Sequence, residues 1–283
     1  MASVPHIPRA FVAGHPIGHS RSPFIHSTWL DRYAIEGTYQ SLDVKGGDFP
    51  GLLDSVRRGE WLGGNVTIPH KEAAFRLCAR RDEDAEAIGA VNTIWLENGR
   101  LVGGNTDAYG FSANLDQHLR GWRDGQRALV LGAGGASRAV LHALLSAGYS
   151  RVDVANRTPE RAETLEQSFG PRVRAHGWDK ADSLVAGADL IVNTTSLGME
   201  GNPPLQLELE GSHVGAMATD IVYAPLETPF LAACIEAGMT TCDGLGMLLH
   251  QAVPGFARWF GTKPEVDAAL RNAVIADLNR PGP

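Results

Sequence analysis

Short apolar runs alternate with longer amphipathic stretches along most of the chain. The short runs predict β-strands at 9–13, 38–44, 62–66, 128–131, 152–155, 190–192 and 216–221. The longer stretches predict helices at about 23–33, at 108–120, after 136, at 245–260 and at 265–278. Strands that alternate with helices form βαβ units, so the pattern predicts an α/β fold with a parallel sheet.

One pair of strands, at 91–97 and 100–103, is expected to form a hairpin. Asn98 and Gly99 join these strands, and both residues tolerate the positive φ that a two-residue turn requires. We place a domain boundary near 107–121, which gives a first domain at 1–107 and a second at 108–244. No strand follows the last two helices, so we expect 245–283 to fold back and complete the first domain.

Composition limits the classes of function. The 283 residues suggest about two domains, and 43% hydrophobic with 20% charged residues is ordinary for a globular protein. The net charge of -7 provides no basic field for nucleic acid or an acidic membrane. An anionic small substrate remains compatible, because its site needs only a few local donors.

The cysteines and the start of the chain indicate a location. The chain has three cysteines, Cys78, Cys234 and Cys242, and no two of them have CxxC spacing. An odd number without such spacing argues against a set of disulfides or a zinc site, so we expect buried thiols in a reducing compartment. The first residues, MASVPHIPRAF, lack the basic and apolar regions of a signal peptide. No apolar run reaches the roughly 18 residues of a membrane helix. The expected location is cytoplasmic, with no membrane partner.

A glycine-rich turn carries the clearest local signal. Gly132, Gly134 and Gly135 lie between an apolar strand and an amphipathic helix. Glycine allows the sharp turn and the close approach of a pyrophosphate, and the helix start offers free N–H groups. Ser137 stands where the fingerprint has Gly or Ala, so the pattern alone is weak. Its strand–turn–helix context favours a dinucleotide site over a tight turn that binds nothing.

The residues after the next strand distinguish NAD from NADP. An acid at the strand end would accept from the ribose hydroxyls of NAD, and Asp153 lies 21 residues after Gly132. We place Asp153 inside the strand, because Val154 and Ala155 continue the apolar run. Arg157 and Arg161 then follow the strand, and two guanidiniums suit a 2′-phosphate. NADP is therefore favoured, although two solvated arginines at a helix start remain the alternative.

Four polar stretches, three of which contain glycine, lie at strand ends or helix starts, at 14–23, 65–71, 89–93 and 104–107. Ligands of open parallel sheets bind at such ends, and hydroxyls and amides suit a polyhydroxylated ligand. Each stretch also has a structural explanation: Ser22 as a helix N-cap, Asp107 as a cap of the next helix, Lys71 as a solvated lysine. His15 and His19 lie in a loop with no acidic residue, so we expect no metal site.

Taken together, these stretches resemble the shikimate dehydrogenase family, the NADP-dependent shikimate 5-dehydrogenases, over nearly the whole chain. GHPIGHSRSPFIH, NVTIPHK, GAVNT and GGNTDAYGF are similar to its substrate and catalytic segments. GAGGASRAV, NRT, NTTSLGM, DIVYAPLETP and DGLGMLLHQA resemble its remaining motifs, in the family's order. Ser27 departs from the pattern, since many members have Asn there. Several motifs in order are far more specific than any one of them.

The resemblance implies an N-terminal α/β substrate domain and a Rossmann-like NADP-binding domain, with the active site in the cleft between them. It implies that Lys71 and Asp107 are the catalytic pair. Substrate would be held by Ser20, Ser22, Asn65, Thr67, Asn92, Tyr223 and Gln251. The cofactor would be held by Gly132, Ala133, Gly134, Gly135, Ala136, Asn156, Arg157, Thr158, Arg161, Thr194, Met199, Ile221, Gly244 and Met247.

The implied activity is the reversible reduction of 3-dehydroshikimate to shikimate with NADPH, in chorismate and aromatic amino-acid biosynthesis. A lysine ammonium suits the alkoxide that forms when a ketone is reduced, and a carboxylate keeps the lysine charged. Two alternatives stay open: an NAD(P)-dependent quinate/shikimate dehydrogenase, and a non-catalytic homologue that senses shikimate-type ligands. The expected partner is a small-molecule substrate, with no nucleic acid, and the chain is a monomer or homodimer.

Overall fold

A computed structural model describes residues 7–280, which divide into two compact units. The first unit contains the residues up to Thr106 and those from Gln251 onward, and the second contains Asp107–His250. The predicted borders were 107 and 245. The second border differs by six residues, because the helix α10 (Leu245–Phe260) begins in the second unit and continues into the first.

The first unit is built on a mixed six-stranded sheet. Its strand order is β2 (Thr38–Asp43), β1 (Arg9–Gly14), β3 (Gly63–Val66), β5 (Thr93–Glu97), β6 (Arg100–Gly104) and β4 (Arg80–Arg81). The first three strands are parallel, but β5 is antiparallel to both neighbours. The expected hairpin is confirmed, with φ of 52° at Asn98 and 72° at Gly99. The sheet is therefore mixed: β2, β1 and β3 are parallel as expected, and the expected hairpin adds antiparallel pairs, because so short a turn can only join antiparallel strands.

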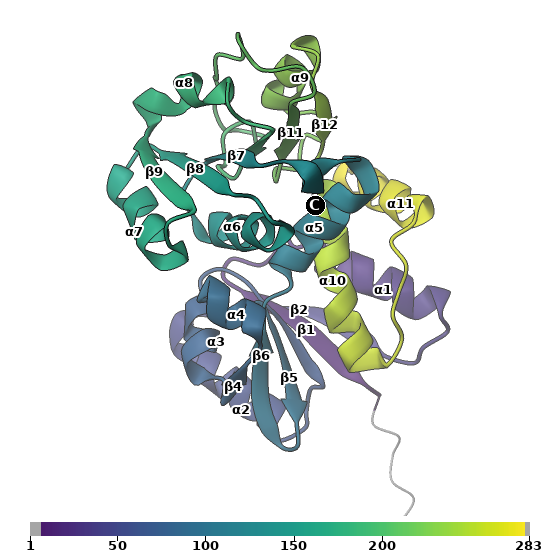
Figure 1. Cartoon of the computed structure of the whole chain (residues 1–283). Helices are drawn as coiled ribbons and strands as arrows, with labels where there is room; N and C mark the ends of the chain where they lie inside the picture. Colours follow the sequence, from purple (N-terminus) through teal and green to yellow (C-terminus); the bar gives the residue numbers. More distant parts are fainter. Residues whose placement is uncertain (1–6, 281–283) are drawn as a thin grey trace, which may run out of the picture. The chain divides into compact units, whose positions relative to one another are not determined.

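Side chains alternate between the two faces of this sheet. Phe11 and Ala13 of β1 pack against α2 (Phe49–Arg57), α3 (Lys71–Leu77) and α4 (Glu83–Ile88), which Figure 1 shows together beside the sheet. A short 3₁₀ turn, η1 (Gly46–Asp48), precedes α2. Ala10 and Val12 pack on the opposite face, with Tyr39 and Trp259 of α10. This alternation is expected, because successive side chains of a β-strand point to opposite faces of the sheet.

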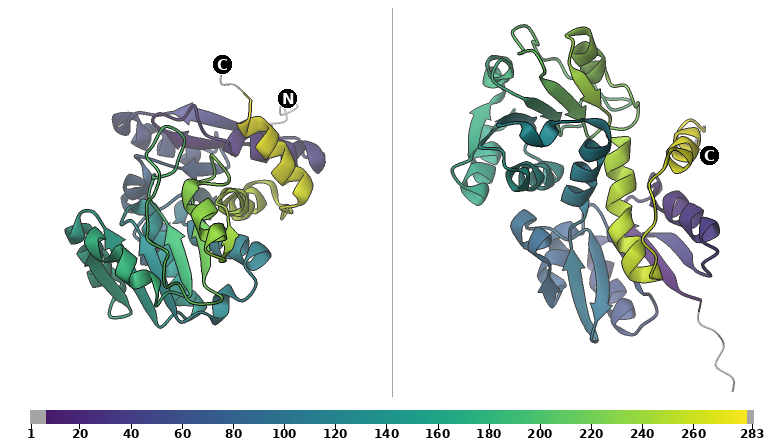
Figure 2. Two further views of the ribbon diagram at one scale, coloured as in Figure 1. Left: turned by 90° about the horizontal axis from the view of Figure 1, so that it is seen from above. Right: turned by 45° about the vertical axis from the view of Figure 1, so that its right-hand side comes forward.

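The end of the chain returns to the first unit. The α11 helix (Ala268–Leu278) lies beside α1 (Ser22–Arg32) in Figure 2, where yellow meets purple. Arg21 of the α1 N-terminus forms an ion pair with Asp277, at 2.8 Å, and Trp29 donates to the Glu265 carbonyl. Helix α11 begins three residues later than predicted, because Asp267 accepts from Leu270 N as its N-cap.

The second unit contains a fully parallel sheet in the order β12 (Thr240–Cys242), β11 (Met217–Asp220), β10 (Leu190–Asn193), β7 (Arg127–Leu131), β8 (Arg151–Asn156) and β9 (Val173–Gly177). If these six strands are numbered in chain order from β7 and the sheet is read from β9, the order is 3-2-1-4-5-6. This is the order of doubly wound dinucleotide-binding sheets. The order reverses between β7 and β10, and ligands of such sheets bind at this point.

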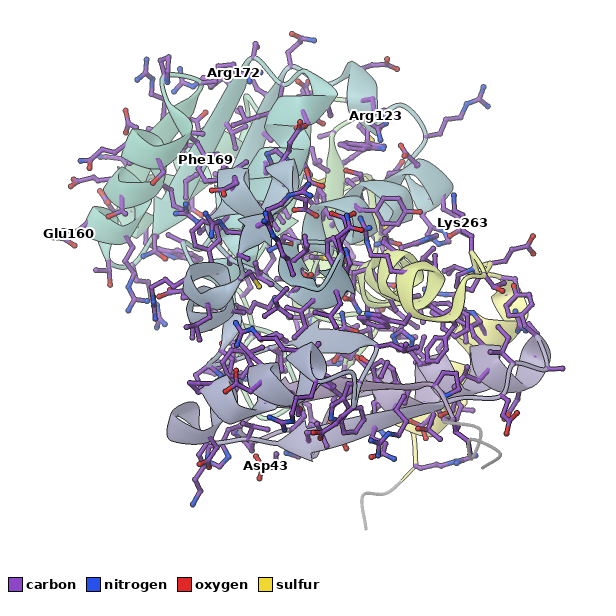
Figure 3. The ribbon with its side chains drawn as sticks, turned by 90° about the horizontal axis from the view of Figure 1, so that it is seen from below. Asp43, Arg123, Glu160, Phe169, Arg172 and Lys263 are labelled. Atoms are coloured by element: carbon purple, nitrogen blue, oxygen red, sulfur yellow. The ribbon has the colours of Figure 1, made fainter. Side chains whose placement is uncertain are left out.

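The helices of the second unit are α5 (Asp107–His118), α6 (Gly135–Ala147), α7 (Pro159–Phe169), α8 (Ala181–Val185) and α9 (Pro229–Glu236), with 3₁₀ turns η2 (Trp122–Asp124) and η3 (Trp178–Lys180). Figure 3 labels Glu160 and Phe169, near the two ends of α7. Every strand and helix predicted from the sequence is present, with ends that differ by three residues or fewer.

Two further expectations concern the whole described chain. The three cysteines are free and buried, as predicted, and burial raises the pKa of the Cys234 thiol to about 12. Among residues 7–280, no helix has both the length and the apolar character needed to cross a bilayer.

Candidate active site

Amide and hydroxyl side chains form a buried network at one edge of the first sheet. Asn65 is the third of the four residues of β3, and its Nδ2 donates to the Asn92 carbonyl at 3.2 Å and to Thr93 Oγ1 at 3.1 Å. Asn92 Oδ1 accepts from Thr93 Oγ1 and from Thr106 N, at 2.8 and 2.9 Å. Because β5 is antiparallel, its start lies at the same edge as the ends of β3 and β6. The network therefore joins three of the four polar stretches.

Lys71 and the residue before Asp107 are held at neighbouring positions of this edge. Lys71 is the first residue of α3, and its carbonyl accepts from Val91 N at 3.1 Å. The next residue, Asn92, binds the backbone and side chain of Thr106. Asp107 follows Thr106 directly and opens α5. Lys71 and Thr106 are thus bound to the consecutive residues Val91 and Asn92, although they are far apart in the sequence.

The residue before Lys71 is fixed by burial. His70 is 1% exposed, and its ring stacks on Phe49 of α2 at 4.5 Å with an interplanar angle of 3°. Its Nε2 lies 2.7 Å from the Val44 carbonyl after β2, so the ring nitrogen that carries a hydrogen is this one. These contacts fix the N-terminus of α3, where Lys71 begins the helix.

The first substrate-type loop, 14–23, packs against the segment that contains Thr67. A Cβ added to Gly14 would lie 2.5 Å from Thr67 Cγ2, and His15 N donates to the Ile68 carbonyl. Ser22 N approaches Ser20 Oγ at 3.4 Å. The N-cap interpretation of Ser22 is wrong, because α1 begins at Ser22 itself and its N-cap position is Arg21. The Ser22 side chain is therefore not used as the cap of α1.

The structure also corrects the description of the histidine loop. Asp43, at the end of β2 and labelled in Figure 3, lies 2.7 Å from His15 Nδ1, so an acidic residue does accompany this histidine. The sequence pattern did not reveal this pair, because the partners are 28 residues apart and meet only through parallel pairing of β1 and β2. Within residues 7–280, no group of three or more His, Cys, Asp or Glu side chains could hold a metal ion.

The glycine-rich turn of the second unit lies where the strand order reverses. Gly132 has φ of +105°, and a Cβ there would lie 2.9 Å from Thr194 Oγ1, at the end of β10. Gly134 and Gly135 are exposed, and a Cβ on either would meet no atom within 4 Å. Gly132 is therefore required by the fold. The next two glycines leave open space at the N-terminus of α6, where anions bind.

Ser137, the departure from the fingerprint, holds the turn together. Its hydroxyl is fully buried, donates to the Gly132 carbonyl at 2.9 Å and accepts from Gly134 N at 3.0 Å. Thr194 Oγ1 lies 2.7 Å from the same oxygen. Thr194 was predicted to bind a cofactor; in this structure its hydroxyl also donates to the Leu131 carbonyl at the end of β7, at 2.8 Å. The serine thus replaces a small apolar contact with three polar ones.

The end of β8 has the composition expected for a phosphate rather than a ribose hydroxyl. Asp153 lies inside β8, as predicted, and is 3% exposed. Burial alone would raise its pKa, but hydrogen bonds from Arg151 and His176 outweigh burial and lower it. Its carboxylate is therefore committed to these partners. Arg157 and Arg161 are both exposed, immediately beyond the strand and in the first turn of α7.

Asn156 connects this strand end to the glycine-rich turn. Its Oδ1 accepts from Ala133 N at 3.1 Å, and its Nδ2 donates to the Thr158 carbonyl at 2.8 Å. The backbone before α7 and the turn before α6 are therefore held by one side chain. Ala136, in the first turn of α6, belongs to the same group of predicted cofactor residues.

A second buried network, which the sequence reasoning missed, joins the loops after β10 and β11. The Asp220 carboxylate accepts from Asn193 Nδ2 at 3.0 Å, from Val222 N at 2.9 Å and from Thr228 Oγ1 at 2.8 Å. Burial raises the pKa of Asp220, although these donated hydrogen bonds oppose the rise. The two loops contain predicted cofactor or substrate residues: Met199, Ile221 and Tyr223.

The remaining predicted residues lie at the start of α10. A Cβ on Gly244 would lie 2.5 Å from the Ile221 carbonyl carbon, so only glycine permits this approach of two backbones. Met247 is on the first turn of α10, half-buried, and Gln251 lies one turn later, in the first unit. Tyr223 belongs to the second unit, in contrast to the other predicted substrate residues except Asp107.

A 3-2-1-4-5-6 sheet with a glycine-rich turn is typical of dinucleotide-binding α/β enzymes, and the first unit adds buried amides at the ends of its strands. Comparison of the sequence with known protein families leads to the same class of protein. Family models match for the shikimate dehydrogenase substrate binding domain at residues 12–94, shikimate / quinate 5-dehydrogenase at 115–199, and the shikimate 5'-dehydrogenase C-terminal domain at 244–271. The chain belongs to the shikimate dehydrogenase family.

Individual relatives are similar over nearly their whole length. A shikimate dehydrogenase (NADP(+)) of Brucella melitensis is 58% identical, covering 97% of this chain and 96% of the relative. A Thermus thermophilus shikimate 5-dehydrogenase, solved with NADP(H) and shikimate, is 40% identical with a TM-score of 0.83, over 96% and 99%. A Corynebacterium glutamicum quinate dehydrogenase, solved with NAD, is 28% identical with a TM-score of 0.88, over 95% and 99%. The backbone alone therefore does not distinguish the cofactor.

Proposed function

We propose that this chain is an NADP-dependent shikimate dehydrogenase, which reversibly reduces 3-dehydroshikimate to shikimate. The observation that carries the proposal is that Val91 N binds the Lys71 carbonyl, while the neighbouring Asn92 binds Thr106, the residue directly before Asp107. The relatives that are at least half identical and bear the name shikimate dehydrogenase (NADP(+)) support the same conclusion.

The substrate residues divide by chemistry. Ser20 and Ser22 supply hydroxyls from the loop before α1 and are proposed to bind the carboxylate. Asn65, Thr67, Asn92 and Gln251 supply amides and a hydroxyl for the ring hydroxyls, together with the carboxylate of Asp107. Tyr223 is proposed to act near the carboxylate. All of these residues come from one chain, so a monomer and a homodimer would each contain complete sites.

The residues of the second unit fit NADP. The turn of Gly132, Ala133, Gly134, Gly135 and Ala136 presents unobstructed backbone at a helix N-terminus, as a pyrophosphate requires. Arg157 and Arg161, with Asn156 and Thr158, would hold the adenosine 2′-phosphate, because guanidinium groups bind phosphate with forked hydrogen bonds. Thr194, Met199, Ile221, Gly244 and Met247 are proposed for the nicotinamide end.

The protein's part of the chemistry is charge and proton transfer. NADPH supplies the hydride that reduces the ketone carbon. The Lys71 ammonium stabilises the negative charge that develops on the ketone oxygen and donates a proton to it, which leaves a neutral amine and the new hydroxyl. In the oxidation direction the amine accepts that hydroxyl proton. Asp107 keeps the ammonium charged and oriented.

The alternatives are less well supported. An NAD-dependent quinate dehydrogenase needs an acid at the end of β8, and Asp153 is buried and bound to Arg151 and His176. A non-catalytic sensor would not need both Lys71 and Asp107.

Absorbance at 340 nm with purified protein tests the proposal. We expect reduction of NADP with shikimate, much slower reduction of NAD with shikimate, and slower turnover of quinate with either cofactor. Equal kcat/KM for NADP and NAD would refute the cofactor assignment. Shikimate binding without turnover of any cofactor would identify a sensor instead.

A further inference from the structure

Tyr39 touches the substrate network but belongs to none of the motifs. It lies on β2, and its hydroxyl donates to Asn65 Oδ1 at 2.6 Å, across the intervening strand β1. The Ser22 side chain, at the start of α1, also acts on this hydroxyl and lowers its pKa. One phenol therefore binds Asn65, which is proposed to hold a ring hydroxyl, and is influenced by Ser22, which is proposed to hold the carboxylate.

The ring of Tyr39 is fixed by its surroundings. Its side chain is 5% exposed and stacks face to face on His26 of α1, with centroids 3.9 Å apart and an interplanar angle of 5°. Trp259 of α10 packs at a tilted angle with its centroid 6.0 Å away. Burial raises the pKa of Tyr39 well above its usual value and lowers the pKa of His26 to about 3. Tyr39 thus remains a protonated donor beside a neutral imidazole at neutral pH.

The bonds of Asn65 show what this donor achieves. Its Nδ2 uses both hydrogens, on the Asn92 carbonyl and on Thr93 Oγ1. Its Oδ1 accepts from Tyr39, and a carbonyl oxygen has two lone pairs. The amide can therefore take only one of its two flip states, and it presents a lone pair of Oδ1 to any further group. A substrate hydroxyl at Asn65 must then be the donor.

We propose that Tyr39 is a positioning residue of the substrate site, whose buried hydroxyl orients the Asn65 amide beside Ser22. This inference rests on the proposed function and adds to it a residue that acts through others. Without the hydroxyl, the Asn65 oxygen loses its inner partner, and the amide is held only by the two hydrogen bonds that its Nδ2 donates. Substrate binding then weakens, while cofactor binding in the second unit and the chemical step are left unchanged.

The test is Tyr39→Phe, with Tyr149→Phe as the matched control. Tyr149 is a buried tyrosine of the second unit whose hydroxyl donates to the Trp122 carbonyl, also at 2.6 Å. We expect Tyr39→Phe to raise the KM for shikimate by about three- to tenfold, the worth of one hydrogen bond. The KM for NADP and kcat should stay within about twofold of wild type. Tyr149→Phe should lower Tm as much and change neither KM.

A double-mutant cycle tests whether Tyr39 acts through Asn65. In an Asn65→Ala background, Tyr39→Phe should add at most about a twofold change in the KM for shikimate. Full additivity would overturn the mechanism. So would a wild-type KM in Tyr39→Phe, or a rise in both KM values that Tyr149→Phe reproduces. Ser22→Ala provides a second cycle that does not depend on the stability of the Asn65 variant.

Calorimetric binding of shikimate separates this inference from the proposed function. Suppose that the wild type turns over shikimate and that Tyr39→Phe has the same Kd and KM for shikimate. This result refutes only the role of Tyr39. A wild-type protein that neither binds nor oxidises shikimate refutes both. A weaker Kd in Tyr39→Phe but not in Tyr149→Phe supports the positioning role even if turnover is slow.

Discussion

The two units present their ligand-binding groups in opposite ways. In the first unit, Asn65 and Asn92 are 5% and 3% exposed, and neighbouring side chains fix their orientation. In the second unit, Arg157 and Arg161 are exposed at the end of β8 and on α7. A small polyhydroxylated ring must be read by rigid groups of defined polarity, whereas a phosphate accepts hydrogen bonds from many directions. The first unit therefore recognises its ligand by the fixed positions of polar groups, and the end of β8 in the second unit recognises a phosphate by charge.

The contrast does not extend to the whole second unit. Its glycine-rich turn is held by Ser137 as firmly as the first unit's edge is held by Asn92. Rigid backbone is needed where a pyrophosphate approaches a helix N-terminus closely. Within the second unit, the exposed arginines Arg157 and Arg161 differ in this respect from the fixed turn.

The largest effect is expected from Lys71, whose charge acts on the reaction itself. Lys71→Met keeps most of the stem and should lower kcat about 10²–10⁴-fold with little change in the KM for shikimate. Steady-state kinetics measure it. Asp107→Asn should act in the same direction, and the double variant should show less than the sum of both effects. A Lys71→Met enzyme with wild-type kcat at saturating substrate would reduce Lys71 to a binding residue.

Arg157 tests recognition by charge. Arg157→Ala should raise the KM for NADP about ten- to a hundredfold, since a charge-assisted hydrogen bond contributes about 1.5–3 kcal/mol. Turnover with NAD and the thermal midpoint should barely change, because the side chain is exposed. Arg172→Ala is a control on the same unit, far from the β8 end in sequence. Equal losses with NAD and NADP would show that Arg157 does not read the 2′-phosphate.

The pH dependence of the free energy of unfolding tests whether His26 stays buried in the folded first unit. The pKa of His26 is lowered to about 3 by burial, so the unfolded chain takes up a proton near pH 6.5 that the folded chain refuses. Its contribution to stability is complete above pH 6.5 and is lost as pH falls toward 3, by about 1 kcal/mol per pH unit. His26→Phe should flatten this slope in urea unfolding measured between pH 7 and 5.

In His26→Phe, the free energy of unfolding should still depend on pH, although less steeply than in the wild type. The pKa of His250 in the second unit is also lowered, to about 4, first by burial and then by His118. His250→Gln should remove part of the slope independently, and the two effects should add. An unchanged pH dependence in His26→Phe would mean that its imidazole gains access to water before the unit unfolds.

The smallest effect is expected from the glycine-rich turn. Ser137→Ala removes the hydroxyl that Gly134 N and the Gly132 carbonyl bind, which should cost about 1–3 kcal/mol of stability. The KM for NADP should rise only about two- to fivefold, because the backbone N–H groups remain. Ser150→Ala, whose exposed hydroxyl donates to the Gln126 carbonyl, is the control. A KM for NADP unchanged in Ser137→Ala would show that glycines alone shape the turn.

Features set by nearby residues were predicted correctly. The hairpin at Asn98 and Gly99, the turn at Gly132 and the interior position of Asp153 all depend on a few consecutive positions. Several short elements were not predicted: β4, β9 and β12 at sheet edges, and α2, α3, α4, α8 and α9. Edge strands pair on one side only, so they need no continuous apolar run and leave little periodicity.

Hydrogen-bond partners across strands required the tertiary structure. Tyr39 meets Asn65 over 26 residues, Asn193 meets Asp220 over 27, and His15 meets Asp43 over 28. Alternation along a strand indicates which face a side chain lies on, but strand order and register decide which residue it meets. Local sequence therefore determined the types of element and the cofactor signature. Sheet assembly alone decided how the buried polar groups are paired, because each pair closes a long loop of chain.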